Sequence, residues 1–346
     1  MPTPRPPIPP QGRPGLRPRK SGSDKGGIIG IVICAGFLCL LGTAGLAEVA
    51  DSGDDAAAPS YEPTYGDTDQ DTDSTASSTI SNPPTSTSET ATPSTERPET
   101  STVPPEPAEP EPVYALGNHP FNIPGNGAVE TGCDLAAFAV ATDAQEAYYQ
   151  SAAPCLMDMW TPALEEANLP AVAPEVITFD SGSVTNPCGR RDADETAMYC
   201  SANHTIYMTA SYYRDVEGHT QPGVYLGQFA HEFGHAVQGM TGILNAYGTA
   251  RHDAGAETSR GLELSRRSEL QATCFGGMAL ASLQNGGVNN NHILTAVQDG
   301  GQRGDYAGRE RDHGSPANNA AWVNQGFSIN RITDCNTWLA DDSDVS

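Results

Sequence analysis

Basic residues are scarce in this chain, and their scarcity excludes a large class of partners. The 346 residues include 18 Lys and Arg against 43 Asp and Glu, a formal net charge of −25 at pH 7. Nucleic-acid binding depends on basic side chains that neutralise phosphates, so we expect no DNA or RNA partner. The eight cysteines never occur as Cys-x-x-Cys. That absence argues against a cysteine-rich structural metal site.

Charge and hydropathy set off the N-terminal part of the chain. Residues 1–25 form a basic tail, and residues 26–47 are 22 uncharged, mostly apolar residues. As a helix this run spans about 33 Å, enough for a hydrocarbon core of about 30 Å. Because basic flanks stay on the cytoplasmic side, we expect a single-pass anchor in the cell membrane, with everything after it outside the cytoplasm. A signal peptide cleaved after Ala47 is the alternative.

The rest of the chain divides into a polar stretch and a domain. Residues 48–112 are rich in Ser, Thr, Pro, Asp and Glu and have almost no apolar side chains. Such a stretch cannot bury enough surface to offset its ordering entropy, which predicts a disordered, extended stalk. Residues 113–346 then form one extracytoplasmic domain, long enough for a proper core.

Six cysteines lie in residues 113–346, and their even number outside the membrane predicts three disulfides. Six cysteines allow fifteen pairings. Proximity in the sequence favours the pairs Cys133–Cys155, Cys188–Cys200 and Cys274–Cys335.

Hydrophobic spacing predicts a helix-rich α+β domain with a small β-sheet. Strands are expected at residues 176–179 and Thr205–Thr209, the second with Tyr199 and Cys200 on its hairpin partner. Apolar residues three and four positions apart predict the helices, with Pro154 separating the first two. These helices are expected over residues 134–150, 156–167, 224–240, 259–283 and 316–329.

The most informative motif is His231-Glu232-Phe233-Gly234-His235. On a helix the two histidines lie one turn apart on one face, so both rings can bind one metal ion. Glu232 can then act on a water molecule at the metal, as the general base of a zinc peptidase does. The alternative is an amphipathic core helix with two incidental histidines, which would be costly to bury without a ligand.

A catalytic zinc site normally has three protein ligands, so a third must come from elsewhere. The pattern that adds a histidine six residues after the second one fails, because Gln238 and Thr241 occupy its Gly and His positions. Glu257, Glu263 and Glu269 remain as candidate carboxylates. Glu263 lies about 120° from Glu269 around the expected helix and is interpreted as a solvated carboxylate. The histidines at positions 119, 204, 219, 252 and 292 lack metal spacing.

The surrounding sequence resembles the neutral zinc metallopeptidase family of bacteria. The resemblance is carried by Gly-Gln-Phe-Ala-His-Glu-Phe-Gly-His-Ala-Val-Gln at residues 227–238 and by Glu-Leu-Gln-Ala-Thr-Cys-Phe-Gly-Gly at residues 269–277. Shorter matches occur in order at residues 188–189, 199–203, 206–208, 313–316, 326–327 and 335–337. Members of this family commonly combine a basic tail, one membrane span and an outer domain.

The resemblance implies a zincin-like domain with a gluzincin-like site. His231, His235 and Glu269 would be the ligands of one Zn²⁺ per chain, and Glu232 the base. The family usually has Asp four residues after the ligand Glu, where this chain has Thr273. An Asp there would orient a ligand histidine, so its replacement predicts weaker zinc binding.

These observations predict zinc-dependent hydrolysis of polypeptides outside the membrane. His313, in a family-like His-Gly-Ser-Pro, is a candidate oxyanion donor, with a role at the start of the following helix as the alternative. The strand Thr205–Thr209 is expected to pair with extended substrate. A different class stays open, a zinc-binding but non-catalytic envelope module that holds a partner protein. Hydrolysis of cell-wall peptide crosslinks would use the same chemistry.

Overall fold

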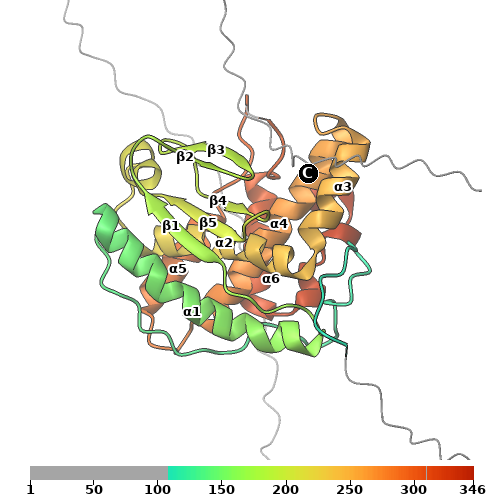
Figure 1. Ribbon diagram of the computed structural model, residues 1–346, viewed down its shortest axis with the longest axis horizontal. Helices are drawn as coiled ribbons and strands as arrows, with labels where there is room; N and C mark the ends of the chain where they lie inside the picture. Colours follow the sequence, from blue (N-terminus) through green and yellow to red (C-terminus); the bar gives the residue numbers. More distant parts are fainter. Residues whose placement is uncertain (1–107, 309) are drawn as a thin grey trace, which may run out of the picture. The chain divides into compact units, whose positions relative to one another are not determined.

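The computed structural model describes residues 108–346 apart from residue 309, and these residues form a helix-rich α+β domain (Figure 1). The predicted tail, the predicted membrane span and the predicted stalk up to residue 107 lie outside the described residues. Within the described part, no helix combines the length and the apolar character that crossing a membrane requires.

Helices dominate the described part of the chain. The α-helices are α1 Thr142–Glu166, α2 Pro222–Thr241, α3 Ile243–Ala254, α4 Ser259–Ser282, α5 Asn290–Gly300 and α6 Pro316–Ile329, and shorter π and 3-10 helices lie at Tyr212–Val216, Ile332–Cys335, Thr337–Leu339 and Asp342–Val345. Helix α4 packs against α2, α3 and α6, as Figure 1 shows. The ends follow from local chemistry: the Ser315 side chain accepts the Asn318 N–H at the start of α6, and Gly242, with a φ of 90°, ends α2. The helices predicted at 224–240, 259–283 and 316–329 are thus confirmed.

A three-stranded sheet has the strand order β1-β5-β4. Strand β5 (Thr205–Thr209) pairs in parallel with β1 (Glu175–Phe179) and antiparallel with β4 (Met198–Cys200), which confirms both predicted strands and the hairpin partner. The hairpin of β2 (Ser183–Asn186) and β3 (Gly189–Asp192) was not predicted. Because β5 is paired with β1 along its whole length and with β4 over Thr205–Tyr207, the expectation that it pairs with substrate is wrong for that part of the strand.

The first helical segment differs from its prediction. One helix, α1, replaces the two predicted over 134–150 and 156–167, and it continues through Pro154. A proline inside a helix costs about 3 kcal/mol. Here Tyr149, Leu156 and Trp160 are fully buried along one face of the helix, and that burial outweighs the missing hydrogen bond.

The stretch before α1 is held in a non-helical path by contacts on both sides. The N–H of Val129 donates to the Met159 carbonyl, and the N–H of Cys133 donates to the Gly286 carbonyl. Cys133 is also bonded to Cys155 of α1. These contacts fix the backbone up to residue 133, and the residues after it stay non-helical until α1 begins at Thr142.

The three predicted disulfides are all formed. Cys133–Cys155 joins the segment before α1 to α1 itself, and Cys188–Cys200 joins the β2–β3 hairpin to β4. Cys274–Cys335 joins α4 to the short 3-10 helix Ile332–Cys335. Pairing by proximity succeeds because each bond connects neighbouring elements of the fold.

His119 is a buried histidine that ties the start of the domain to the end of α2. Its Nε2 lies 2.9 Å from the Val113 carbonyl oxygen and 3.0 Å from that of Thr241, while the Phe121 N–H donates to Nδ1. Nδ1 must therefore be an acceptor, so the folded protein holds a neutral ring protonated at Nε2. Burial lowers the pKa of His119 below its ordinary value of 6.5, and the two carbonyls oppose this in part.

This lowered pKa predicts acid destabilisation. Above pH 6.5 both the folded and unfolded states hold a neutral ring, and the full stability is present. As the pH falls below 6.5, the unfolded state takes up a proton before the folded state does, so the free energy of unfolding falls. We expect urea unfolding between pH 7.5 and pH 5 to show a steeper loss for the native chain than for His119→Gln. Equal slopes would contradict the assignment.

Candidate metal centre

Helix α2 presents His231 and His235 on one face. Pro222 occupies the first turn, where its missing N–H costs nothing, and apolar residues at helical spacing bury the opposite side. The two rings are 4.8 Å apart between centroids and nearly perpendicular, at 88°. Two imidazoles one turn apart therefore face a common point, as the motif predicts.

Helix α4 brings Glu269 to that point because small residues let the two helices approach closely. A Cβ on Gly234 would lie 2.6 Å from the Ala272 carbonyl oxygen, and one on Gly276 would lie 3.3 Å from the His231 backbone nitrogen. Any side chain at Gly234 would push α4 away. The spacing between the helices, and hence the reach of Glu269, depends on this contact.

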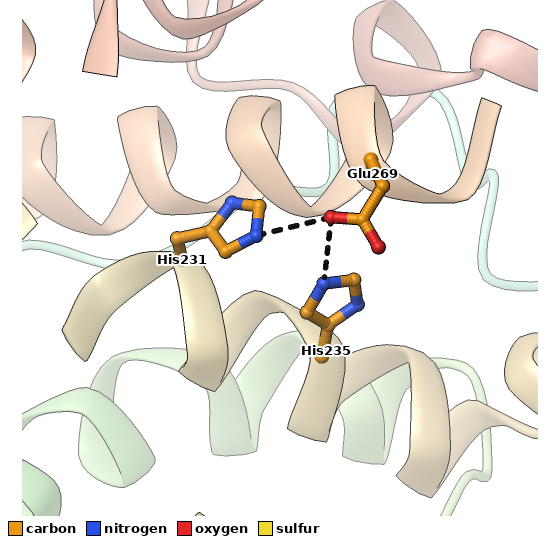
Figure 2. A group of neighbouring side chains, drawn as sticks. All are labelled: His231, His235 and Glu269. Atoms are coloured by element: carbon orange, nitrogen blue, oxygen red, sulfur yellow. Dashed lines mark hydrogen bonds and ion pairs between the residues drawn. The ribbon is translucent and has the colours of Figure 1, made fainter. Parts of the chain in front are cut away.

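The three side chains converge on one point, as Figure 2 shows. Glu269 Oε2 lies 3.3 Å from His231 Nε2 and 3.2 Å from His235 Nε2. The three ligand-type atoms all lie within 4.8 Å of one another. Tetrahedral ligands of a zinc ion lie about 3.4 Å apart, given bonds of about 2.0–2.1 Å. Both the spacing and the set of two nitrogens and one oxygen fit zinc.

The side chains of the cluster are partly exposed to solvent, and their charges shift one another's pKa values. The side chains of His231, His235 and Glu269 are 23%, 13% and 24% exposed. Burial raises the pKa of the Glu269 carboxyl, but His235, His313 and His231 hold it well below its ordinary value. Burial lowers the pKa of His235, but Glu269, Glu232 and Gln238 raise it to about 9. The carboxylate form of Glu269, which a metal requires, is thus favoured.

Glu232 lies beside this cluster and is almost fully buried, 6% exposed. Its charge acts on His235, as noted above, and on Tyr213, whose pKa is raised mainly by burial and next by Glu232. The carboxylate therefore lies in a weakly solvated environment next to the histidines.

His313 comes from the segment before α6 and reaches the edge of the cluster. Its Nε2 is 3.9 Å from Glu269 Oε2, its Nδ1 is 2.6 Å from Asp312 Oδ1, and its side chain is 54% exposed. Packing around the ring lowers the pKa of His313, but Glu269, Asp312 and Asp305 raise it to about 10. The Asp305 carboxylate accepts the N–H groups of His313 and Gly314 and so fixes this segment.

The other sequence candidates lie elsewhere. Glu257 is exposed and Glu263 belongs to no cluster of ligand-type residues in the described part of the chain. Glu263 is not solvated as predicted, because Arg260 and Arg267 approach it to 2.7 and 2.8 Å. Burial raises the pKa of Glu263, and the two guanidinium groups lower it below its ordinary value. An Arg four residues after a Glu on a helix was the available signal.

Several residues outside the predicted ligand set hold the cluster in place, and of these the sequence pointed only to Thr273. Thr273 Oγ1 lies 3.3 Å from His231 Nδ1, so it occupies the position expected for an Asp and supplies a neutral acceptor. Gln238 Oε1 lies 2.8 Å from His235 Nδ1. Gln271 and Asn319 contact Gln238 and Thr273 in turn. The sequence offers no local spacing that would have identified the last two.

Comparison with known proteins places most of the domain in one family. Residues 129–338 match the family described as "Putative neutral zinc metallopeptidase". The protein YpfJ of Escherichia coli K12 is 29% identical over 196 residues, which cover 52% of this chain and 67% of YpfJ. The protein Mb2605 of Mycobacterium bovis is 28% identical over 189 residues, covering 47% of this chain and 61% of Mb2605. Both relatives carry the description "uncharacterized", and no solved structure matches the chain.

Proposed function

The chain belongs to the neutral zinc metallopeptidase family, and we propose that it hydrolyses peptide bonds of extracytoplasmic polypeptides with one zinc ion per chain. The observation that carries the proposal is the convergence of His231 Nε2, His235 Nε2 and Glu269 Oε2. We propose these three groups as the zinc ligands in a zincin-like domain. When bound, zinc would polarise a peptide carbonyl and lower the pKa of a water molecule at its open position.

The protein's own residues would manage the protons and the developing charge. Glu232 would accept a proton on its carboxylate from the attacking water and return it to the leaving amine. Its burial beside His235 supports this role. We propose His313 as the donor to the carbonyl oxygen, because its Nε2 faces the cluster while Asp312 holds Nδ1.

Because β5 is paired with β1 along its whole length and with β4 over Thr205–Tyr207, we propose that extended substrate pairs with an outer strand of the sheet. Strand β4 is a better candidate than β1 because it packs against α2, the helix that carries His231 and His235. The Tyr199 hydroxyl lies so close to α2 that a Cβ on Gly239 would meet it at 2.3 Å. Substrate paired with β4 would lie alongside the helix that carries both histidines.

The disulfides of the domain support the proposed location. Three disulfides within one domain are typical of proteins that fold outside the cytoplasm. Together with the predicted span at residues 26–47, this supports a domain tethered to the outer face of the cell membrane through the stalk at 48–112. The membrane anchor and these domain limits are part of the proposal.

Zinc content and cleavage test the proposal together. The purified full-length chain is dialysed against zinc and assayed on an unfolded, carboxymethylated protein and on cross-linked cell-wall peptides. We expect one zinc per chain, with cleavage that a chelator abolishes and added zinc restores. Stoichiometric zinc without cleavage of either substrate would favour the non-catalytic binding module instead.

A further inference from the structure

The two histidines of the cluster each make a second hydrogen bond, on the ring nitrogen that faces away from Glu269. His235 Nδ1 lies 2.8 Å from Gln238 Oε1, and His231 Nδ1 lies 3.3 Å from Thr273 Oγ1. Which atom donates decides which nitrogen keeps a lone pair for a cation. The answer follows from groups farther along each chain of hydrogen bonds.

The first chain starts at Trp338, whose indole N–H can only donate. Its Nε1 lies 3.0 Å from Gln271 Oε1, so that atom must be the amide oxygen. The Gln271 amide nitrogen then faces the Cys335 carbonyl oxygen at 3.3 Å, an acceptor that agrees with this orientation. Two partners of opposite type thus fix the Gln271 amide.

The orientation of Gln271 passes to Gln238. The Gln238 amide nitrogen donates to Gln271 Oε1 at 3.0 Å and to the Ser268 carbonyl oxygen at 2.9 Å, both of which are acceptors. Gln238 Oε1 therefore faces His235, and His235 Nδ1 must carry the proton. Nδ1 keeps that proton whether Nε2 ion-pairs with Glu269 or binds a cation.

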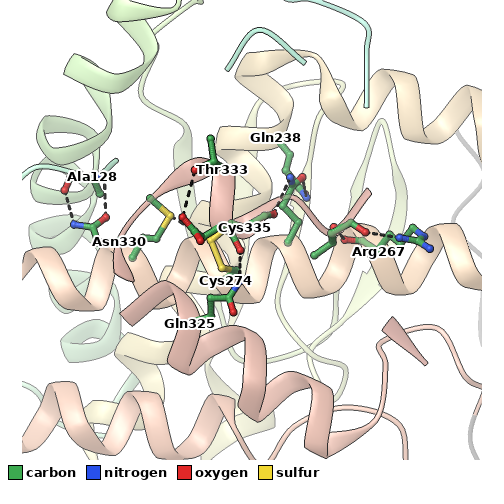
Figure 3. The surroundings of a disulfide bond; sticks show 12 residues. Ala128, Gln238, Arg267, Cys274, Gln325, Asn330, Thr333 and Cys335 are labelled. Carbon is green, nitrogen blue, oxygen red and sulfur yellow. Dashed lines mark hydrogen bonds between the residues drawn. A yellow bond between two sulfur atoms is a disulfide. The ribbon is translucent and has the colours of Figure 1, made fainter. Parts of the chain in front are cut away.

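We propose that Gln238 and Gln271 are positioning residues that hold His235 with its proton on Nδ1 and Nε2 directed at the metal. The inference rests on the proposed zinc site. Gln238 and Gln271 are both buried, so neither amide is free to exchange its partners for water. The Gln271 end of this chain of hydrogen bonds is anchored through the Cys335 carbonyl. Cys335 is bonded to Cys274 of α4, the helix that carries Glu269 (Figure 3).

His231 is held by an equivalent arrangement. The Asn319 amide nitrogen faces the carbonyl oxygens of His313, Gly314 and Ser315 at 3.0 to 3.3 Å, so its oxygen faces Thr273. The Thr273 hydroxyl must donate to Asn319 Oδ1, 3.3 Å away, and its lone pair is left for the His231 Nδ1 proton. Both ligand histidines are thus oriented by neutral groups anchored on backbone carbonyls.

The test compares Gln238→Met with Gln145→Met in the full-length chain. Gln145 is also buried and donates to two backbone carbonyls, those of Val140 and Ala210, but it touches neither histidine. Zinc affinity is measured by competition with a chelator. We expect Gln238→Met to bind zinc about 10–100-fold more weakly than the native chain, the usual cost of removing such a partner. The Gln145 variant should bind zinc like the native chain.

A spectroscopic readout separates orientation from general loss of packing. In zinc-loaded protein labelled with 15N-histidine, His235 should show a protected Nδ1–H signal that Gln238→Met removes and Gln145→Met retains. Gln271→Met leaves the Gln238–His235 hydrogen bond in place. It should weaken zinc binding by a smaller factor, because the Ser268 carbonyl still holds Gln238. This variant replaces Gln238→Met in the test if Gln238→Met fails to fold. Native-like zinc affinity and an intact signal in Gln238→Met would overturn the positioning role of Gln238 and Gln271, but not the proposed zinc site. Failure of the native chain to bind zinc would overturn the proposed site as well.

Discussion

Glu232→Gln is expected to lower peptide cleavage by about 10²–10⁴-fold, the usual contribution of a general acid–base group. Gln has the same shape as Glu but cannot accept a proton from the attacking water. Glu232 supplies none of the three converging ligand atoms, so zinc should stay bound to the variant. The measurement is kcat/KM on the unfolded protein substrate, with zinc content determined on the same sample.

A matched control is available in Glu257, an exposed carboxylate that the sequence also offered as a ligand. Glu257→Gln removes the same charge from the chain but should leave cleavage unchanged. If Glu232→Gln cleaved at the native rate with zinc bound, Glu232 could not be the base. If it lost its zinc, the residue would instead help to hold the metal.

Much of the candidate site could be predicted from the sequence because its signals are local. The His-Glu-x-x-His spacing fixes the relation of the two histidines within one helix, whatever the rest of the fold does. Pro222 and Gly242 mark the ends of that helix, and Ser315 marks the start of α6. Glu269, in contrast, could be chosen among three carboxylates only through resemblance, because its reach depends on how closely α4 packs against α2.

What the sequence could not predict depends on long-range contacts. The bond from Trp338 to Gln271 joins positions 67 residues apart, and that from Gln238 to Gln271 joins positions 33 apart. No periodicity links such residues. The path of α1 through Pro154 is a similar case, since the buried face of the helix outweighs a residue that ordinarily ends one. Predictions from local sequence failed where tertiary packing stabilised a conformation by more free energy than the local preference opposed it.

Removing the Cys274–Cys335 disulfide by replacing both cysteines with Ala is expected to cost about 4 kcal/mol of stability, on the chain-entropy model for its loop. The bond spans 61 residues, whereas Cys188–Cys200 spans 12. The same model gives about 3 kcal/mol for the shorter loop. For a domain of this size, the larger loss would lower the melting temperature by about 8–16 °C.

The second double variant replaces Cys188 and Cys200 with Ala. The two double variants should differ more in zinc affinity than in the free energy of unfolding. Loss of Cys274–Cys335 frees the segment whose carbonyl orients Gln271, and it also cuts a cross-link to α4 close to Glu269. Zinc affinity should therefore fall in that variant. The Cys188–Cys200 bond ties the β2–β3 hairpin to β4 and cross-links neither α2 nor α4, so its removal should leave zinc affinity near the native value. Thermal unfolding and chelator competition, run on both variants, separate the two effects. Equal zinc affinity in the two variants would show that the site does not depend on the anchor at Cys335.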